Sequence, residues 1–242
     1  MGGISWPSVL QYLPSLLTGF VITIVLTIVV IVIAAVLGIL VALGRMSRVR
    51  ILSIIFGAYV EFMRSTPLLL QLIYIYFALP FLGIRLNPFV SAIAGLSLNY
   101  TAYLSEVYRG GIQSVPEGQL EAAKALGMRS HLIMMKIVLP QAIRIVIPSL
   151  GNYLISLFKD TSLASALTVR ELMFSGQLIA ARTFNYFTVY TIIFILYFVA
   201  GYPASLLVRY LEKRGRKSSV SKSKTRTPSP IGGTTGEGGQ SI

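Results

Sequence analysis

Three apolar stretches of the chain carry polar side chains at helical spacing. Residues three or four positions apart share one face of a helix, so each set forms a polar stripe. Such side chains supply hydrogen-bond donors, acceptors and both signs of charge, which suits recognition of a small polar solute. The stripes contain Glu61, Arg64 and Gln71, then Asn99, Tyr103 and Glu106, and finally Ser149, Asn152, Ser156 and Lys159, followed by Asp160 and Thr161.

The composition excludes several kinds of active site. The chain has no cysteine and only one histidine, His131, so disulfides, thiolate metal sites, histidine metal clusters and a Ser-His-Asp triad are not expected. The phosphate-binding pattern G-x-x-x-x-G-K-[ST] is also missing. We therefore predict that the chain is not an enzyme and holds no metal or other cofactor of its own. Energy for any transport must come from another chain or from an ion gradient.

The polar stripes lie in a sequence that is too apolar to face water on all sides. Apolar residues make up 55% of the chain and charged residues 12%, whereas a soluble domain has about 25% charged residues. In lipid the backbone must satisfy its own hydrogen bonds, and helices do so within one segment. The sequence predicts an all-α, multi-pass protein of the cell (cytoplasmic) membrane.

Five segments are long and apolar enough to be transmembrane helices, each of which needs about 20 apolar residues. They lie at Leu16–Leu43, within Ile51–Leu82, and at about Pro88–Tyr108, Ile137–Phe158 and Phe184–Val208. Proline removes a backbone hydrogen bond, so we expect a break at Pro67 and kinks at Pro140 and Pro148. The region of Gly38 and Gly44 is expected to allow close helix packing.

Basic residues set the predicted orientation. They concentrate in the connections after the first and third spans and after the last span, and such loops normally face the cytoplasm. The N-terminus is therefore predicted outside and the C-terminus in the cytoplasm. The C-terminal basic residues are expected to meet anionic lipid rather than nucleic acid, because no nucleic-acid recognition fold accompanies the charge. They are Arg209, Lys213, Arg214, Arg216, Lys217, Lys222, Lys224 and Arg226.

Each polar stripe has a structural and a functional interpretation. In the structural one the side chains bond to neighbouring helices, and Glu61 with Arg64 forms an ion pair across one helical turn. In the functional one they line a solute pathway, since polar groups in a bilayer tend to face a pathway or a partner. The predicted pathway residues are Asn99, Tyr103, Asn152 and Ser156 near mid-membrane, with Lys159, Asp160 and Thr161 near the outer boundary.

The connection Ser114–Pro140 is too polar to span a membrane, yet it has helix signals. Ser114 followed by Glu117 fits a capping box, and Pro116 suits a first helical turn. Good helix formers follow, and Gly127 is placed to end the helix in a left-handed conformation. We predict a helix, a glycine turn and a second short helix on the cytoplasmic face.

This connection also resembles a known motif. Glu121-Ala122-Ala123, then Gly127, then Ile137-x-Leu139-Pro140 has the residues and the spacing of the EAA loop of ABC importer permeases. The resemblance extends over about Leu16 to Leu211 and points to the polar amino-acid branch of histidine, glutamine and arginine type. It rests further on Glu61-x-x-Arg64-x-Thr66-Pro67-Leu68-Leu69, on Arg109-Gly110-Gly111-Ile112, and on Gly151-Asn152 with Lys159-Asp160-Thr161-Ser162-Leu163.

The resemblance implies a function and several partners. In that family the EAA loop docks on a separate ATPase subunit, which binds ATP and Mg²⁺, and the permease works with a second, identical or paralogous permease and an extracytoplasmic solute-binding protein. The fold implied is that of a type I ABC importer permease carrying polar amino acids. The residues expected to make the ATPase contact are Glu117, Glu121, Ala122, Ala123 and Gly127.

The residues alone leave two other functions open. One is an ion-gradient-driven transporter or channel, motivated by Glu61, Arg64 and Glu106 within the spans. The other is a membrane scaffold, which does not account for the polar stripes. The predicted organisation is a permease domain over residues 1–213, with its coupling loop at about 112–136, and a basic cytoplasmic tail over 214–242 that is too polar to fold.

Overall fold

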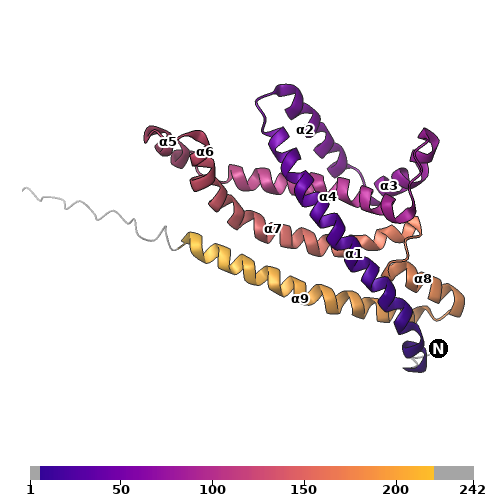
Figure 1. Cartoon of the computed structure of the whole chain (residues 1–242). Helices are drawn as coiled ribbons and strands as arrows, with labels where there is room; N and C mark the ends of the chain where they lie inside the picture. The colour runs from indigo at the N-terminus through magenta and orange to yellow at the C-terminus, as the bar shows by residue number, and fades with distance from the viewer. Residues whose placement is uncertain (1–5, 221–242) are drawn as a thin grey trace, which may run out of the picture.

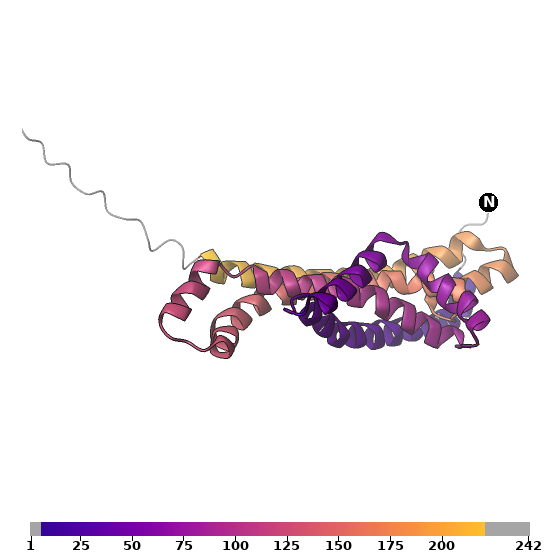
Figure 2. The ribbon, with the colours of Figure 1, turned by 90° about the horizontal axis from the view of Figure 1, so that it is seen from above.

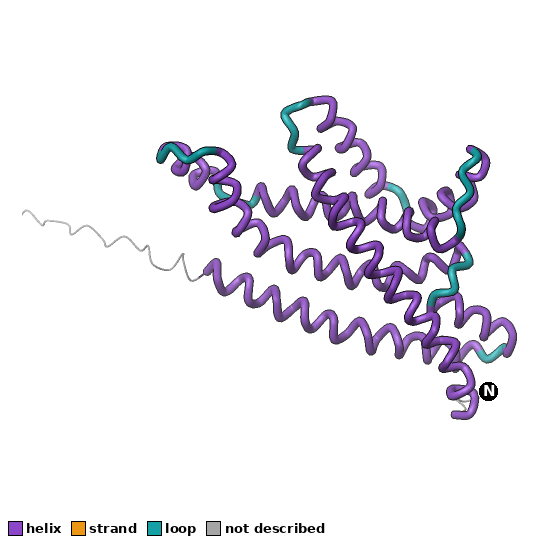
Figure 3. The backbone as a smooth tube through the Cα atoms, viewed as in Figure 1, coloured by secondary structure: helices purple, strands orange, loops and turns teal. Residues whose placement is uncertain are grey.

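A computed structural model describes residues 6–220, and within that range the chain forms helices and loops but no strand (Figures 1 and 3). The all-helical prediction is therefore confirmed. The elements run in the order α1 (Trp6–Arg45), α2 (Arg50–Ser65), α3 (Leu68–Ile73), η1 (Tyr74–Ala78), η2 (Leu79–Leu82), α4 (Pro88–Gln113), α5 (Glu117–Ala125), α6 (Ser130–Ile133), η3 (Met134–Val138), α7 (Leu139–Asp160), η4 (Thr161–Leu167), α8 (Leu172–Thr183) and α9 (Tyr186–Val220).

Three helical segments in the described range are long and apolar enough to cross a membrane. They are Val9–Arg45, Ser130–Leu167 and Tyr186–Tyr210, and they match the first, fourth and fifth predicted spans. The bent pair Arg50–Ser65 and Leu68–Leu82 can form one further span. The third predicted span coincides with the long helix α4, which carries more polar residues. The number of spans and their orientation stay predictions.

α1 and α4 form the centre of the bundle and cross each other closely (Figure 1). A buried apolar cluster joins them through Leu26, Val30 and Ala34 of α1 and Leu96, Tyr100 and Leu104 of α4. Gly38 makes the approach possible, because an added Cβ would lie 3.1 Å from Tyr108 Cε2 and 3.2 Å from Leu104 Cβ. The expected role of Gly38 in close helix packing is confirmed.

The predicted break at Pro67 is present. α2 ends at Ser65, α3 begins at Leu68, and the two helical segments meet at an angle of 108°. Proline cannot donate the backbone hydrogen bond that would continue the helix. Of the other prolines, Pro140 lies in the first turn of α7 and Pro148 lies inside that helix.

The connection between α4 and α7 projects from one end of the bundle, whereas α8 and the N-terminal part of α1 lie at the opposite end (Figure 2). As predicted, it contains a helix, a glycine turn and a second short helix. The capping box is wrong, because Ser114 lies at the C-terminal end of α4 and its Oγ donates to the carbonyl of Gly111. Pro116 takes the position before α5, and no side chain caps that helix.

α9 packs along α7 and continues beyond the predicted end of the permease domain. Its last residue is Val220, so the helix includes the first residues of the tail predicted to begin at 214. The remainder of that predicted tail, residues 221–242, lies outside the described residues.

Candidate functional site

The α2–α3 break is stabilised by side chains that replace the missing backbone hydrogen bonds. Gln71 Nε2 donates to the carbonyl oxygens of Met63 at 2.9 Å and Thr66 at 3.2 Å, and Asn99 Nδ2 donates to Met63 O at 3.1 Å and to Gln71 Oε1 at 3.0 Å. Asn99 is only 3% exposed. The structure therefore gives Asn99, a predicted pathway residue, a structural contact between helices.

A hollow of about 440 Å³ opens beside this break. Gln71, Thr66 and Tyr74 carry its polar groups, and the other lining side chains are apolar. Broken helices at membrane depth occur where the irregular backbone is buried or lines a cavity, and the second condition holds here because Thr66, at the break, lines the hollow. The lining residues are Phe62, Met63, Thr66, Leu70, Gln71, Tyr74, Ile75 and Leu98.

Three tyrosines and one carboxylate bring α4 and α7 together. The ring centroids of Tyr103 and Tyr153 are 5.7 Å apart, and each lies 6.4 Å from the ring of Tyr100. Tyr100 donates its hydroxyl hydrogen to Asp160 Oδ2 at 2.7 Å. Aromatic faces beside a carboxylate can hold an ammonium group. The structure thus brings two predicted pathway residues, Tyr103 and Asp160, into one cluster.

The other predicted residues of α7 lie in different surroundings. Lys159 is exposed next to Asp160, and Thr161 is fully buried with its hydroxyl donating to the carbonyl of Phe158. Asn152 is exposed and its Nδ2 donates to Glu212 Oε1 of α9 at 2.7 Å. Ser156 is half-buried. The predicted α7 stripe therefore divides between the aromatic cluster, the helix interior and the α9 contact.

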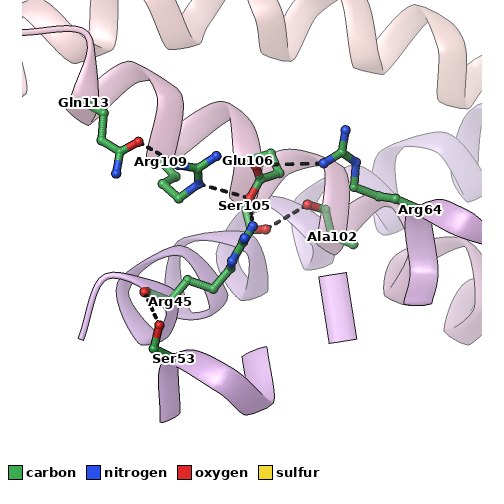
Figure 4. Close-up of polar contacts among 8 residues, drawn as sticks. All are labelled: Arg45, Ser53, Arg64, Ala102, Ser105, Glu106, Arg109 and Gln113. Atoms are coloured by element: carbon green, nitrogen blue, oxygen red, sulfur yellow. Dashed lines mark hydrogen bonds and ion pairs between the residues drawn. The ribbon is translucent and has the colours of Figure 1, made fainter. Parts of the chain in front are cut away.

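Charged residues from three helices converge on Glu106 of α4 (Figure 4). Arg109 Nη2 lies 2.6 Å from Glu106 Oε2, Arg45 at the end of α1 pairs with Oε1, and Arg64 of α2 lies 3.9 Å from Oε2. The predicted Glu61–Arg64 pair is wrong, because Arg64 turns toward Glu106 and Glu61 accepts a hydrogen bond from Ser65. An interhelical partner replaced the local one, and spacing along one helix cannot predict that.

The coupling loop presents most of its predicted contact residues to solvent. Glu117, Glu121, Ala122 and Gly127 are exposed, whereas Ala123 is 3% exposed. Ala123 belongs to a separate small core with Val115, Ile133 and Val138, so its described contacts are within the loop.

Two further features fix the shape of the loop. Gly127 has φ +73°, the left-handed conformation predicted for it, and an added Cβ would find open space. Gln141 Nε2 of α7 donates to Gln119 Oε1 of α5 at 2.8 Å. The loop is therefore an ordered unit tied to the start of α7.

Glu171 carries a buried carboxylate that the polar stripes did not predict. It has no exposed surface, and its carboxylate accepts hydrogen bonds from the backbone N–H groups of Met173 and Phe174 at the start of α8. Thr23 of α1 and Tyr197 of α9 also donate to it, at 3.4 and 3.3 Å. Its partners come from three elements far apart in sequence, so a pattern within one helix could not find it.

Comparisons with known proteins agree with this architecture. Residues 34–217 match the family described as binding-protein-dependent transport system inner membrane component. The L-cystine transport system permease protein TcyB of Bacillus subtilis (strain 168) is 42% identical over 213 residues, which is 87% of this chain and 91% of that protein. The probable glutamine ABC transporter permease protein GlnM of the same organism is 40% identical over 200 residues, covering 83% of this chain and 93% of the relative.

Solved structures give the same result. A chain in the crystal structure of an amino acid ABC transporter with histidines has a TM-score of 0.84 and 34% identity, covering 88% of this chain and 100% of that one. The MetNI methionine ABC transporter in an inward-facing conformation shares the fold, with a TM-score of 0.61 and 21% identity over 86% of this chain and 99% of that one. The chain belongs to the family of binding-protein-dependent transport system inner membrane components.

Proposed function

We propose that this chain is the permease subunit of an ATP-driven importer for polar amino acids. The observation that carries the proposal is the exposed α5–Gly127–α6 unit at one end of a bundle whose family serves binding-protein-dependent transport. The names of the relatives, which include cystine and glutamine permeases, support amino acids as the solute class. In this proposal a separate ATPase binds ATP and Mg²⁺, and a solute-binding protein delivers the amino acid.

The coupling loop has the properties of a docking element. α5 exposes Glu117, Glu121 and Ala122 on an ordered helix, and the small alanine allows a partner surface to approach closely. The buried core formed by Ala123 and its neighbours keeps the helix in place. The ATPase is proposed to bind this exposed face, and each of two permease subunits would carry one such element.

The solute pathway is proposed to follow the face of α4 and α7 that carries Tyr103, Lys159 and Asp160. An amino acid carries an ammonium and a carboxylate, so its pathway needs groups of both charges. Asp160 and the aromatic rings suit the ammonium, and the exposed Lys159 suits the carboxylate. Asn99 and Thr161 are not part of this proposal because their side chains are buried in helix contacts.

The ATPase contact can be tested with two glycines of the loop. Gly127→Asp adds a carboxylate at the turn and strains the backbone, because a residue with a side chain rarely adopts the left-handed conformation of Gly127. Gly118→Asp adds the same carboxylate within α5, where a Cβ meets open space. We expect Gly127→Asp to insert into the membrane normally but to lose the ATPase during co-purification, together with ATP-driven uptake. Gly118→Asp is the control for added charge.

Uptake into proteoliposomes tests the energy source. Uptake of a radiolabelled amino acid should require ATP and should persist when an uncoupler abolishes ion gradients. Uptake that persists without ATP but collapses with the uncoupler would contradict the proposal and favour a gradient-driven transporter. Normal transport by Gly127→Asp would contradict the docking assignment alone.

A further inference from the structure

The cluster around Glu106 carries more positive than negative charge. Three arginines, Arg45, Arg64 and Arg109, face this carboxylate among the ion pairs of the described residues (Figure 4). Glu61 is a second negative group that acts on Arg45, so three positive charges meet two negative ones and one positive charge is in excess. All four side chains are partly shielded from solvent, with Glu106 only 19% exposed. Water screens the charges of Arg45 and Glu106 less than it would at a free surface, whereas Arg64 remains open to solvent. The excess positive charge therefore favours an additional anionic group at this place.

The three arginines hold Glu106 unequally. Arg109 donates to it twice, from Nη2 at 2.6 Å and from Nε at 3.2 Å, and also donates to Gln113 at 2.6 Å. Arg45 pairs with the other carboxylate oxygen, and the nitrogen that does so has no contact with solvent. Arg64 is 3.9 Å away and 43% exposed, which makes it the loosest and most accessible of the three.

Arg64 also lies at one end of the proposed pathway. Its guanidinium carbon is 5.6 Å from the ring centroid of Tyr103. Tyr103 in turn packs against Tyr153 and Tyr100, and the hydroxyl of Tyr100 reaches Asp160. Side chains in contact therefore connect Asp160, which suits an ammonium group, with Arg64. Among the described residues, the ion pair of Arg64 is its 3.9 Å contact with Glu106.

We propose that Arg64 is a carboxylate-binding residue of the pathway. The α-carboxylate of a passing amino acid replaces Glu106 as the partner of Arg64, while Arg45 and Arg109 keep their pairs with Glu106. The planar guanidinium can take a carboxylate through two parallel hydrogen bonds. This inference rests on the proposed function, in which Lys159 next to Asp160 takes the carboxylate. Arg64, beside Tyr103, adds a second place along the pathway where that group is bound.

The exchange has a low energetic cost on the protein side. Removing one partner from a buried ion pair is costly when it leaves a charge unpaired. Glu106 would keep two arginines, and the contact given up by Arg64 is at 3.9 Å, the longest of the three. Arg109 could not exchange in the same way without breaking two short hydrogen bonds to Glu106.

A fluorescence titration on the complete transporter complex in nanodiscs tests the proposal. This chain has a single tryptophan, so Trp6→Phe with Tyr103→Trp leaves its one tryptophan directly beside Arg64 and keeps an aromatic ring there. The same complex carrying Trp6→Phe alone gives the background from the partner subunits. The probes are L-glutamine, L-arginine and L-glutamate, which differ in side-chain charge but share the α-carboxylate, and n-butylamine, which has none. The reporter protein should respond to all three amino acids more strongly than to n-butylamine, which can meet the aromatic cluster and Asp160 but not Arg64.

Substitutions in the reporter protein identify the arginine responsible. Arg64→Gln should weaken the response to each of the three amino acids about tenfold or more, and Arg64→Lys should restore part of it. Arg109→Gln leaves Glu106 with Arg45 alone once Arg64 is released, so it should weaken the response, but clearly less than Arg64→Gln does. A merely structural cluster predicts that Arg109→Gln is at least as harmful as Arg64→Gln.

Several outcomes would overturn the inference. They are an unchanged response in Arg64→Gln, a loss confined to L-glutamate, an equal response to n-butylamine, and equal losses in Arg64→Gln and Arg109→Gln. ATP-driven uptake by the complex without these substitutions is measured in parallel. Its absence contradicts the proposed function, whereas its presence with unchanged binding in Arg64→Gln contradicts only the assignment of Arg64.

Discussion

The side-chain amide of Asn99 on α4 donates a hydrogen bond to the backbone carbonyl oxygen of Met63 on α2, with 3.1 Å between the two atoms. Met63 lies in the last turn of α2, where the helix no longer supplies partners for its carbonyls. A side chain from another helix supplies one instead. The contact explains how a helix can stop within an apolar bundle without leaving the carbonyl of Met63 unpaired.

Asn99→Leu should destabilise the protein, because Met63 O loses one of its two donors and Gln71 Oε1 loses the amide that faces it. Leaving buried polar groups short of partners costs about 1–3 kcal/mol. The measurement is the thermal unfolding midpoint of the purified protein in nanodiscs. Asn152→Ala, which removes an exposed hydrogen bond to Glu212, is the control and should shift the midpoint much less. Equal shifts would contradict the structural role of Asn99.

Replacement of Gly38 by leucine should separate α1 from α4. The first added carbon would already lie 3.1 Å from Tyr108 and 3.2 Å from Leu104, and a full side chain has no room. Overpacking of this kind costs about 1–3 kcal/mol. Gly57→Leu introduces the same side chain into α2 where a Cβ meets nothing within 4 Å. A lower unfolding midpoint is expected for Gly38→Leu only, and similar midpoints in both variants would count against the close crossing.

Asp160→Asn and Tyr100→Phe remove the two sides of one hydrogen bond but should differ in function. The first removes the negative charge proposed to meet the ammonium group of the solute, and the second leaves that charge in place. We expect ATP-driven amino-acid uptake to fall about tenfold or more in Asp160→Asn and less than about threefold in Tyr100→Phe. Uptake measured in proteoliposomes with equal protein content decides this. An equal loss in both variants would mean that the bond itself, and not the charge, matters.

Glu171→Gln should loosen the packing of α8 against α1 and α9. The carboxylate accepts hydrogen bonds at both oxygens, and an amide can accept at only one of them. The expected loss of stability is about 1–3 kcal/mol. It should appear as faster hydrogen exchange in α8 and a lower unfolding midpoint. Glu121→Gln, at an exposed position of α5, provides the comparison and should change neither quantity.

Local features of the fold could be predicted from the sequence because each has a local cause. The break at Pro67 follows from a missing N–H group, and the left-handed turn at Gly127 follows from a missing Cβ. The apolar runs likewise determine where long helices form. The capping box failed because Ser114 could bond backward to Gly111 at the end of the preceding helix, an alternative that the same residue type always offers.

Contacts between helices could not be predicted in the same way. Periodicity shows which residues share a face but not which other helix covers that face. Asn99 and Asp160 were both predicted to line the pathway. In the structure Asn99 is enclosed by α2 and α3, whereas Asp160 joins the aromatic cluster. Arg64 was paired with its neighbour Glu61 for the same reason, since its actual partner lies on α4.

The small core of the coupling loop has a mechanical consequence. Val115 comes from the turn between α4 and α5, Ala123 from α5, Ile133 from α6 and Val138 from η3, so the whole connection is stiff rather than a flexible tether. Pushing on α5 would move α6 and the first turn of α7 along with it, because bending the connection would require exposing that core. In the proposed transporter, Ile133→Ala would loosen this core. The complex should then hydrolyse ATP without moving solute, which parallel measurements of ATPase activity and uptake would show.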